Sequence, residues 1–366
     1  MNWCMEQILV GVILLIFAFT LAGCWDRVEL ENRAFAVAMG IDVQDGQFEF
    51  AVASARSESN DEGDDEDKNN EDDEEAADKQ PAQSNRLIEA IQSLDASSSR
   101  KLFLGQAKTA VFGKNLLKDE NLFREAIYEL ENRSDIDRSI SVLATTSKVT
   151  DIINASPSGE EKPGYYVVNF HDIAPKTGGK SFNQNFELMM AGLRETSGSA
   201  LLPLIEIEKE EKIAGAAVIK NYQFAGEMDG IELRGLLWAK SGACKGAIIT
   251  SQDIPMTVHR HRSNMHFSEE NGTLRTIIEV HIKGEVADFW GETPPSFVYD
   301  NFIAKEMETS IEKIQQELEV DALSLRRALQ KKNYRLYQRY ADSPERWEQT
   351  FVDMKIVPVV SCSINR

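Results

Sequence analysis

Asn271 and Gly272 restrict the fold more than any other feature, because alternating apolar and polar residues flank them on both sides. An Asn-Gly pair readily supplies the two left-handed residues of a type I′ turn, which joins two antiparallel strands. Pairing outward from this turn places Met265 opposite Ile278 and gathers the bulky residues on one face. That face consists of Met265, Phe267, Leu274, Thr276, Ile278, Val280 and Ile282. We therefore expect a long hairpin with one side facing a core.

The opposite face of this hairpin is polar and rich in cations. It carries Arg260, Arg262, Asn264, His266, Arg275, Glu279, His281 and Lys283. Such a face suits either a solvated sheet surface or a docking surface for a protein partner or for anionic lipid headgroups. The candidate docking residues are Arg260, Arg262, Arg275 and Lys283.

Helices are expected to cover the apolar face of the hairpin. Apolar residues recur at steps of three and four between Ile303 and Leu318, which is the spacing of one helix face. A second helix follows, and a last one begins at Ser343, a capping residue with Pro344 behind it. The chain then closes with a strand over 357–362. The C-terminal part is therefore predicted to be an antiparallel sheet covered by helices on one face.

The N-terminal half carries a second hairpin signal at Asp45-Gly46. Bulky residues occupy every odd position over 35–43 and small residues fill the gaps, which predicts one bulky and one closely covered strand face. A two-residue loop pairs Ile41 with Phe50. Further helices are expected at 87–94, 122–130, 148–154 and 182–193, and strands at 102–112 and 139–145. Strands and helices without regular alternation favour an α+β fold.

An acidic run interrupts this half of the chain. Between Glu58 and Lys79 there are 13 acidic residues against 2 lysines, with no aromatic or β-branched residue. Such a segment cannot bury apolar surface, so residues 57–82 are expected to form a solvated, disordered insertion. Calcium binding is an alternative, but the spacing lacks the central glycine and the terminal glutamate of an EF-hand loop.

The length of 366 residues exceeds that of one ordinary core, and the pattern changes twice along the chain. We predict an α+β domain over residues 24–196 and a small β-rich middle domain with short, glycine-containing strands over 197–255. A second α+β domain follows over 256–366. The predicted fold class is therefore a three-domain α+β protein of mixed sheets and helices.

Charge and cysteine content limit the function. The net charge of −20 argues against nucleic-acid binding, since 40 Lys and Arg residues face 60 Asp and Glu residues. Of the four cysteines, Cys4 lies in a segment that we expect to be removed, and Cys24 has a role of its own. Cys244 and Cys362 either form one disulfide in an exported protein or stay as two buried thiols, which is the simpler interpretation.

The N-terminus has the features of a lipoprotein signal peptide over residues 1–23. No charged residue occurs over 7–23, and the apolar stretch is shorter than the roughly 20 residues that span a bilayer. Leu21-Ala22-Gly23-Cys24 resembles a bacterial lipobox, in which small residues precede a cysteine whose sulfur receives diacylglycerol. The segment before it departs from the usual pattern, because it contains Glu6 and no Lys or Arg. An uncleaved membrane helix and a buried core helix are the alternatives.

Behind the lipobox, the sequence reads Cys24-Trp25-Asp26 and then reaches Gly40-Ile41-Asp42 at the end of the first predicted strand. Further motifs follow in order at 85–91 with 99–102, at 215–220 with 224–226, and at 347–351 with 356–360. Each later motif is weak alone, but the combination with the lipobox is specific. Together they resemble the Ger(x)C family, the C subunits of bacterial spore germinant receptors, along the whole mature chain.

This resemblance implies a non-catalytic subunit that is anchored to the membrane through lipid on Cys24. It would lie on the outer face of the spore inner membrane and assemble there with the A and B subunits of the germinant receptor. The alternative class is a lipid-anchored solute-binding protein of a transporter. Such proteins usually have lobes built from βαβ units, a pattern that this sequence lacks.

No residue pattern points to catalysis, a metal or a cofactor. The register of the hairpin puts His261 on the apolar face, and it separates His266 from His281, so these and His259 are not expected to share a metal. The stretch Gly178-Gly179-Lys180-Ser181 imitates the end of a P-loop, but alanine occupies the required first glycine position. HExxH and GxSxG motifs are absent as well. We therefore predict that the protein is not an enzyme and has no cofactor.

Overall fold

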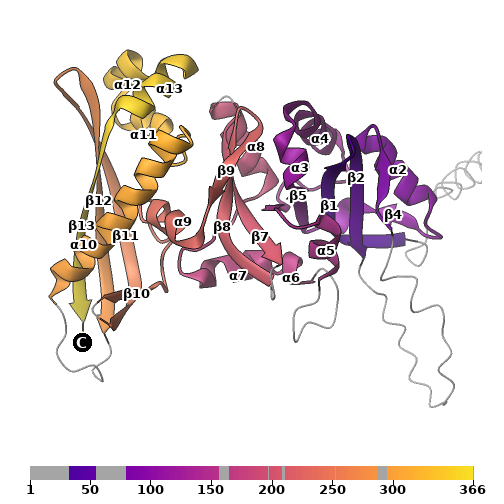
Figure 1. Cartoon of the computed structure of the whole chain (residues 1–366), viewed down its shortest axis with the longest axis horizontal. Helices are drawn as coiled ribbons and strands as arrows, with labels where there is room; N and C mark the ends of the chain where they lie inside the picture. Colours follow the sequence, from indigo (N-terminus) through magenta and orange to yellow (C-terminus); the bar gives the residue numbers. More distant parts are fainter. Residues whose placement is uncertain are drawn as a thin grey trace, which may run out of the picture.

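The computed structural model describes residues 33–54, 80–155, 165–196, 198–207, 211–251, 253–286 and 295–365. Two β-sheets with helices packed on them lie side by side along the long axis of the molecule (Figure 1). This arrangement confirms the predicted α+β class. The predicted signal segment with Cys24 and the acidic run both fall outside the described residues. Of the predicted insertion over 57–82, only residues 80–82 are described, and Ala82 begins a strand there.

The first sheet has nine strands, and eight of them follow the order β3-β2-β1-β5-β6-β7-β8-β9. Their bounds are β1 (Arg33–Gln44), β2 (Gln47–Ser54), β3 (Ala82–Ser84), β5 (Thr109–Gly113), β6 (Ser141–Thr145), β7 (Ala200–Ile207), β8 (Glu211–Lys220) and β9 (Gln223–Met228). Strand β4 (Lys101–Phe103) pairs with the start of β1. Antiparallel hairpins form the two ends of the sheet, and β1, β5, β6 and β7 run parallel in its middle.

Helices cover both faces of this sheet. The larger core lies under α2 (Leu87–Ala96), α3 (Lys114–Lys118), α4 (Glu120–Asn132) and α8 (Phe186–Glu195). The smaller core lies under α5 (Val149–Asn154), α6 (Tyr165–Val168) and α7 (Phe170–Ile173), which a 3-10 turn (Ala174–Thr177) follows. The predicted helices are therefore confirmed, although α8 begins four residues later than expected. It starts behind Asn185, whose side chain accepts a hydrogen bond from the Leu188 backbone.

The predicted register of the first hairpin is confirmed, since Ile41 pairs with Phe50 around Asp45-Gly46. The prediction of one continuous bulky face is wrong. A β-bulge between Ala36 and Ala38 shifts the alternation by one residue, so Val37 packs into the smaller core while Met39 packs into the larger one. Both faces of β1 are covered, so apolar residues on either side give no signal of the bulge.

The expected strand over 102–112 is two strands, because a 3-10 turn over Leu104–Gln106 separates β4 from β5. Phe103 pairs with Phe35, whereas Thr109 pairs with Ala38. Six residues separate Phe103 from Thr109, but only three separate their partners in β1. The 3-10 turn accommodates the three extra residues. Strand β3 was not predicted, because three residues at a sheet edge, Ala82, Gln83 and Ser84, are too few to show a periodic pattern.

The segment predicted as a middle domain contributes to both sheets. Strands β7–β9 extend the first sheet, while α9 (Gly230–Leu237) and β10 (Ile248–Ser251) pack into the second core. The helix α9 was not expected there. It begins with a capping box in which Asp229 accepts from the backbone of α9 and Glu232 accepts from the backbone of Asp229. The division into three domains at 196 and 255 stays a prediction.

The second sheet has the order β10-β11-β12-β13, with β11 (Ile254–Glu270), β12 (Thr273–Val286) and β13 (Lys355–Asn365). Met265 pairs with Ile278 and Phe267 with Thr276, as the Asn271-Gly272 turn predicts. Strand β13 is longer than expected and runs parallel to β12, so the sheet is mixed and not antiparallel throughout as predicted. Helix α10 (Ser296–Glu312) continues into a π-helical turn (Lys313–Glu317). Then follow α11 (Leu325–Lys332), α12 (Tyr334–Tyr340) and α13 (Pro344–Asp353).

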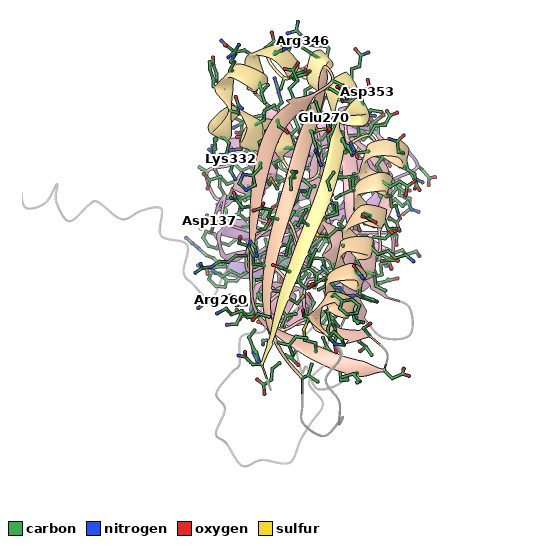
Figure 2. All side chains as sticks on the ribbon, turned by 90° about the vertical axis from the view of Figure 1, so that its left-hand side faces the viewer. Asp137, Arg260, Glu270, Lys332, Arg346 and Asp353 are labelled. Carbon is green, nitrogen blue, oxygen red and sulfur yellow. The ribbon has the colours of Figure 1, made fainter. Side chains whose placement is uncertain are left out.

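These helices cover one face of the second sheet, and the opposite face is open (Figure 2). The apolar face of the hairpin, Ile303, Met307, Ile311 and the other predicted helix residues all lie in this core. The prediction of a sheet covered on one face by helices is therefore confirmed. Two short helices, α11 and α12, stand where one was expected.

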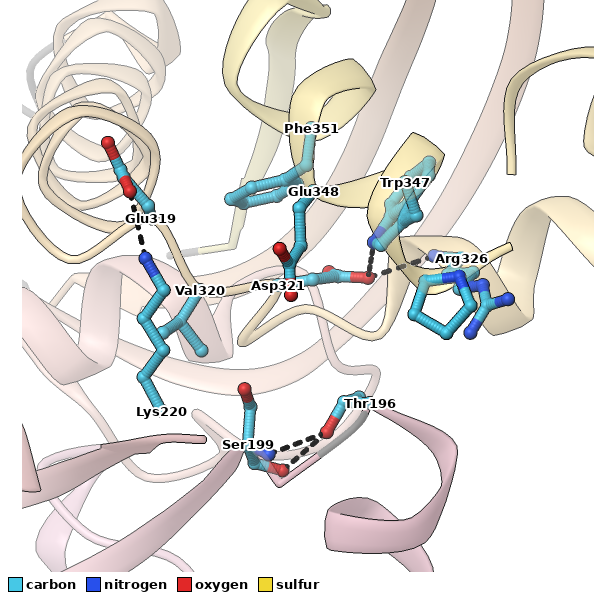
Figure 3. A pocket seen from close by; sticks show the side chains of 11 residues that line it. Thr196, Ser199, Lys220, Glu319, Val320, Asp321, Arg326, Trp347, Glu348 and Phe351 are labelled. Atoms are coloured by element: carbon cyan, nitrogen blue, oxygen red, sulfur yellow. Dashed lines mark hydrogen bonds and ion pairs between the residues drawn. The ribbon is translucent and has the colours of Figure 1, made fainter. Parts of the chain in front are cut away.

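The first sheet with its helices forms an N-terminal unit, and the second sheet with its helices forms a C-terminal unit. The two units meet at a small cavity of about 30 Å³ (Figure 3). Asp321 reaches it from the C-terminal unit and accepts hydrogen bonds from the backbone of Leu325 and Arg326 and from Trp347 Nε1, at 2.8, 2.9 and 3.1 Å. Burial raises the pKa of the Asp321 carboxyl. Lys220 of β8 pairs with Glu319 across the junction at 2.8 Å. The cavity is too small for a ligand larger than a water molecule.

Candidate functional site

The open face of the second sheet is the candidate site. Side chains alternate along its strands, so every second residue of β11, β12 and β13 points away from the helices. Arg262, His281 and Ser361 form one row across the three strands, and Arg260, Lys283 and Ser363 form the next row. These two rows line a shallow depression of about 370 Å³.

Three of the four predicted docking residues lie together in these rows: Arg260, Arg262 and Lys283. In the described part of the chain, none of the three has a carboxylate within ion-pair distance. Two acids of the face, Glu285 and Glu279, lie in the rows on either side and contact His259 and His266 at 2.8 and 3.2 Å. The depression is therefore cationic and unneutralised.

Arg275, the fourth predicted residue, lies elsewhere. It is on the same face, but eight residues along β12 separate it from Lys283, which corresponds to about 26 Å. There its guanidinium pairs with Glu270 beside the hairpin turn at 3.2 Å. The register predicted from the sequence placed all four cations on the correct face of the sheet. It did not show that they divide into two groups.

Among the residues that the structure describes, no histidine belongs to a cluster of metal-ligating side chains. His266 contacts Glu279 at 3.2 Å, and His281 Nδ1 contacts Ser361 Oγ at 2.7 Å. His261 points into the core as predicted. There its Nε2–H donates to the Lys240 carbonyl oxygen at 2.7 Å, and its ring meets Trp238 edge-on.

Burial of His261 predicts a specific pH dependence of stability. Desolvation lowers the pKa of this imidazole below its ordinary value, and Nδ1 has no partner in the described structure. The unfolded state therefore takes up a proton first as the pH falls below about 6.5, and the folded state loses stability by up to about 1.4 kcal/mol per pH unit. Chemical denaturation between pH 7.5 and 5 should show this slope in the wild type and a smaller one in His261→Gln.

The matched control is His259→Gln, which changes an exposed histidine in the same strand. This variant should keep the slope that His261 contributes. Equal slopes for the wild type and His261→Gln would contradict the assignment of a neutral, buried imidazole.

The glycines of the P-loop-like stretch have a packing role. Gly178 and Gly179 both have positive φ, and a Cβ at Gly179 would lie 2.7 Å from the Cys244 sulfur. A Cβ at Gly178 would lie 2.9 Å from the Cα atom of Ala247. Only glycine lets this loop approach the 244–247 segment so closely. The stretch follows a 3-10 turn and therefore lacks the strand that precedes the loop in a P-loop.

Cys244 and Cys362 are free thiols, the former buried and the latter half-buried. Burial raises the pKa of both thiols, which makes them poor nucleophiles at neutral pH. Cys362 lies in β13, where its backbone N–H donates to Asp300 of α10 at 2.6 Å.

Two charged features of the fold were missed from the sequence. One is a buried ion pair between Arg234 of α9 and Glu306 of α10, whose side chains are both 8% exposed. The other is the surface of α11 and α12, where six cations occur without an acid over residues 322–341. The second had a plain sequence signal in its charge pattern, whereas the first depends on two helices that meet only in the fold.

The structure thus defines an α+β protein with two sheets, whose candidate site is an open sheet face. No helix in the described ranges is long and apolar enough to cross a bilayer. Two family profiles match this chain. One is described as the spore germination protein N-terminal domain and matches residues 26–207. The other is described as spore germination B3/GerAC like, C-terminal, and matches residues 214–366.

The chain therefore belongs to the spore germination Ger(x)C family, which confirms the resemblance. It is 22% identical over 298 residues to a protein of Bacillus subtilis (strain 168) named as spore germination protein YfkR, covering 76% of this chain and 74% of that protein. The crystal structure of the GerBC protein has the same fold, with a TM-score of 0.52 and 17% identity over 71% of this chain and 79% of that one.

Proposed function

We propose that this protein is the C subunit of a spore nutrient-germinant receptor and acts without catalysis, through assembly with the A and B subunits. The observation that carries the proposal is the match of both halves of the chain to spore germination profiles, over residues 26–207 and 214–366. The lipobox at Cys24 supports the further proposal of a lipid anchor, which would hold the chain on the outer face of the spore inner membrane.

The cationic depression is the proposed docking surface for a partner subunit. Its three cations are exposed, lie in two adjacent rows and are not neutralised by described carboxylates. Because the chain as a whole has a net charge of −20, a local cationic surface would orient it toward an acidic partner during association. The register of the sheet beneath fixes the backbone positions from which the three side chains extend.

Charge reversal tests this surface. We expect spores that carry Arg260→Glu and Arg262→Glu together to germinate more slowly with nutrients, toward the level of a strain without the gene. Both substitutions are exposed, so each should change the free energy of unfolding by less than about 0.5 kcal/mol. The measurements are nutrient germination of the spores and immunoblots of all three subunits.

The control is a second double variant with the same change in net charge, Lys305→Glu with Lys118→Glu. Lys305 lies on α10 and Lys118 ends α3, so both are exposed and lie off the open face of the second sheet. This control should germinate normally. Normal germination and normal subunit levels in the Arg260 and Arg262 variant would contradict the docking proposal and show that this face is only a solvated surface.

A further inference from the structure

The surface of α11 and α12 is the most cationic part of the described structure. Residues 322–341 contain no acid, although the chain has 20 more acidic than basic residues. Their cations are Arg326, Arg327, Lys331, Lys332, Arg335 and Arg339, interleaved with Tyr334, Tyr337 and Tyr340. The two helices lie at the end of the C-terminal unit, beside the turn of the β11–β12 hairpin (Figure 1).

The inner side of these helices is fixed to the fold. Leu325 and Leu329 are buried in the second core, and Asp321 accepts from the first backbone N–H groups of α11. Asn333 caps α12 by accepting from the Leu336 backbone at 3.2 Å. Lys332 donates to the Met265 carbonyl oxygen at 2.9 Å. The outer side chains are therefore presented from a rigid base.

The cations divide into those used by the fold and those left over. Arg326 donates to the Ala341 carbonyl oxygen, and Arg339 pairs with Glu269 at 2.7 Å. Arg327 makes one long ion pair, at 3.4 Å, with its side chain 53% exposed. Lys331 and Arg335 are exposed and have no ion-pair partner in the described ranges. Three cations with little or no structural use thus remain on this surface.

Exposed tyrosine accompanies these cations. Tyr334 is 58% exposed and stacks on Tyr337, with ring centroids 5.8 Å apart. An amphipathic ring beside long cationic side chains is the combination found where proteins contact the headgroup layer of a bilayer. Such residues also occur in protein interfaces, but the proposed anchor at Cys24 holds this chain beside a bilayer. Anionic headgroups are then present at high local concentration, which favours a lipid surface over a soluble acidic partner.

We propose that α11 and α12 bind anionic lipid headgroups, as a membrane contact separate from the proposed anchor at Cys24. Arg327, Lys331 and Arg335 supply the attraction, and Tyr334 enters the headgroup layer. One lipid attachment leaves a long molecule free to tilt, whereas a cationic contact at its other unit fixes its orientation. Headgroup binding should fall with rising salt, because exposed charges are screened.

The test uses the full-length, lipidated chain in two kinds of vesicle. One contains phosphatidylcholine alone, and the other contains phosphatidylcholine with about 30 mol% phosphatidylglycerol. Hydrogen–deuterium exchange is followed in peptides that cover α11 and α12. We expect these peptides to be protected in the anionic vesicles at low salt, and to lose this protection at high salt. The rest of the C-terminal unit should exchange equally in both.

Charge reversal at Arg327, Lys331 and Arg335 to Glu should abolish the protection. Each surface cation strengthens the contact with an anionic bilayer about fivefold. Loss of three cations therefore lowers the equilibrium constant for contact of α11 and α12 with the headgroups by more than about 100-fold. The matched control is the triple variant Lys118→Glu, Lys245→Glu and Lys305→Glu. It changes the net charge by the same amount at exposed sites elsewhere, and α11 and α12 should stay protected in this variant. Unchanged exchange in the core peptides of both variants shows that they fold.

Equal exchange of α11 and α12 in both vesicles would overturn the proposal. Protection that appears only after the A and B subunits are added, whatever the lipid, would also overturn it and assign the surface to a protein partner. Neither result depends on whether the open sheet face binds a subunit. The test therefore distinguishes failure of the headgroup-binding proposal from failure of the subunit-docking proposal.

Discussion

Replacing Glu306 with alanine is expected to lower the free energy of unfolding by about 3–5 kcal/mol, because it leaves the Arg234 guanidinium buried without a counter-charge. Glu306 is the acceptor for Arg234, which donates through two nitrogens, and for Trp238 Nε1 at 3.1 Å. These contacts join α9 to α10 inside the second core. Urea denaturation of the wild type and the variant measures the difference.

The double variant Arg234→Met with Glu306→Leu separates the charge effect from the loss of packing. It removes both charges and keeps most of the volume, so it should recover a large part of the stability that Glu306→Ala loses. An exposed pair, Arg124 with Glu120, serves as the control, and Glu120→Ala should cost less than about 1 kcal/mol. A cost below about 1 kcal/mol for Glu306→Ala would show that the pair is not buried in solution.

Loss of the sulfur at residue 24 is expected to abolish lipidation. Cys24→Ala should remove incorporation of labelled palmitate and leave an uncleaved precursor, because acylation and cleavage both act at this cysteine. Cys4→Ala is the matched control, since Cys4 lies in the segment that the proposed cleavage removes. Absence of label from the wild-type protein would contradict the proposed lipid anchor.

The elements that could be predicted from the sequence are those whose residues interact over short distances. Asn271-Gly272 and Asp45-Gly46 set their hairpin registers, because a two-residue turn leaves one way to pair the flanking strands. The helix face from Ile303 to Leu318 follows from a spacing of three and four. The cationic face was found for the same reason, since alternation along β11 and β12 assigns each side chain to one face.

Apart from the cations of α11 and α12, which had a local signal in the charge pattern, the features that were missed depend on the packing of segments far apart in the sequence. The bulge after Ala36 is invisible where both strand faces are apolar, and the break at Leu104 reflects the offset between β4 and β5 along β1. The separation of Arg275 from Arg260 is a matter of distance along the strand and of its contact with Glu270. The pairing of Arg234 with Glu306 requires the packing of α9 on α10.

The central proposal is assembly with receptor partners, and isolation of the chain from spore membranes tests it most directly. A tagged form, solubilised in mild detergent from dormant spores, is expected to bring down the A and B subunits together, in amounts similar to its own. The Arg260 and Arg262 double variant should bring down less of both, and the Lys305 and Lys118 control should match the wild type. Recovery of a transporter permease without either receptor subunit would contradict the proposal and favour a solute-binding protein.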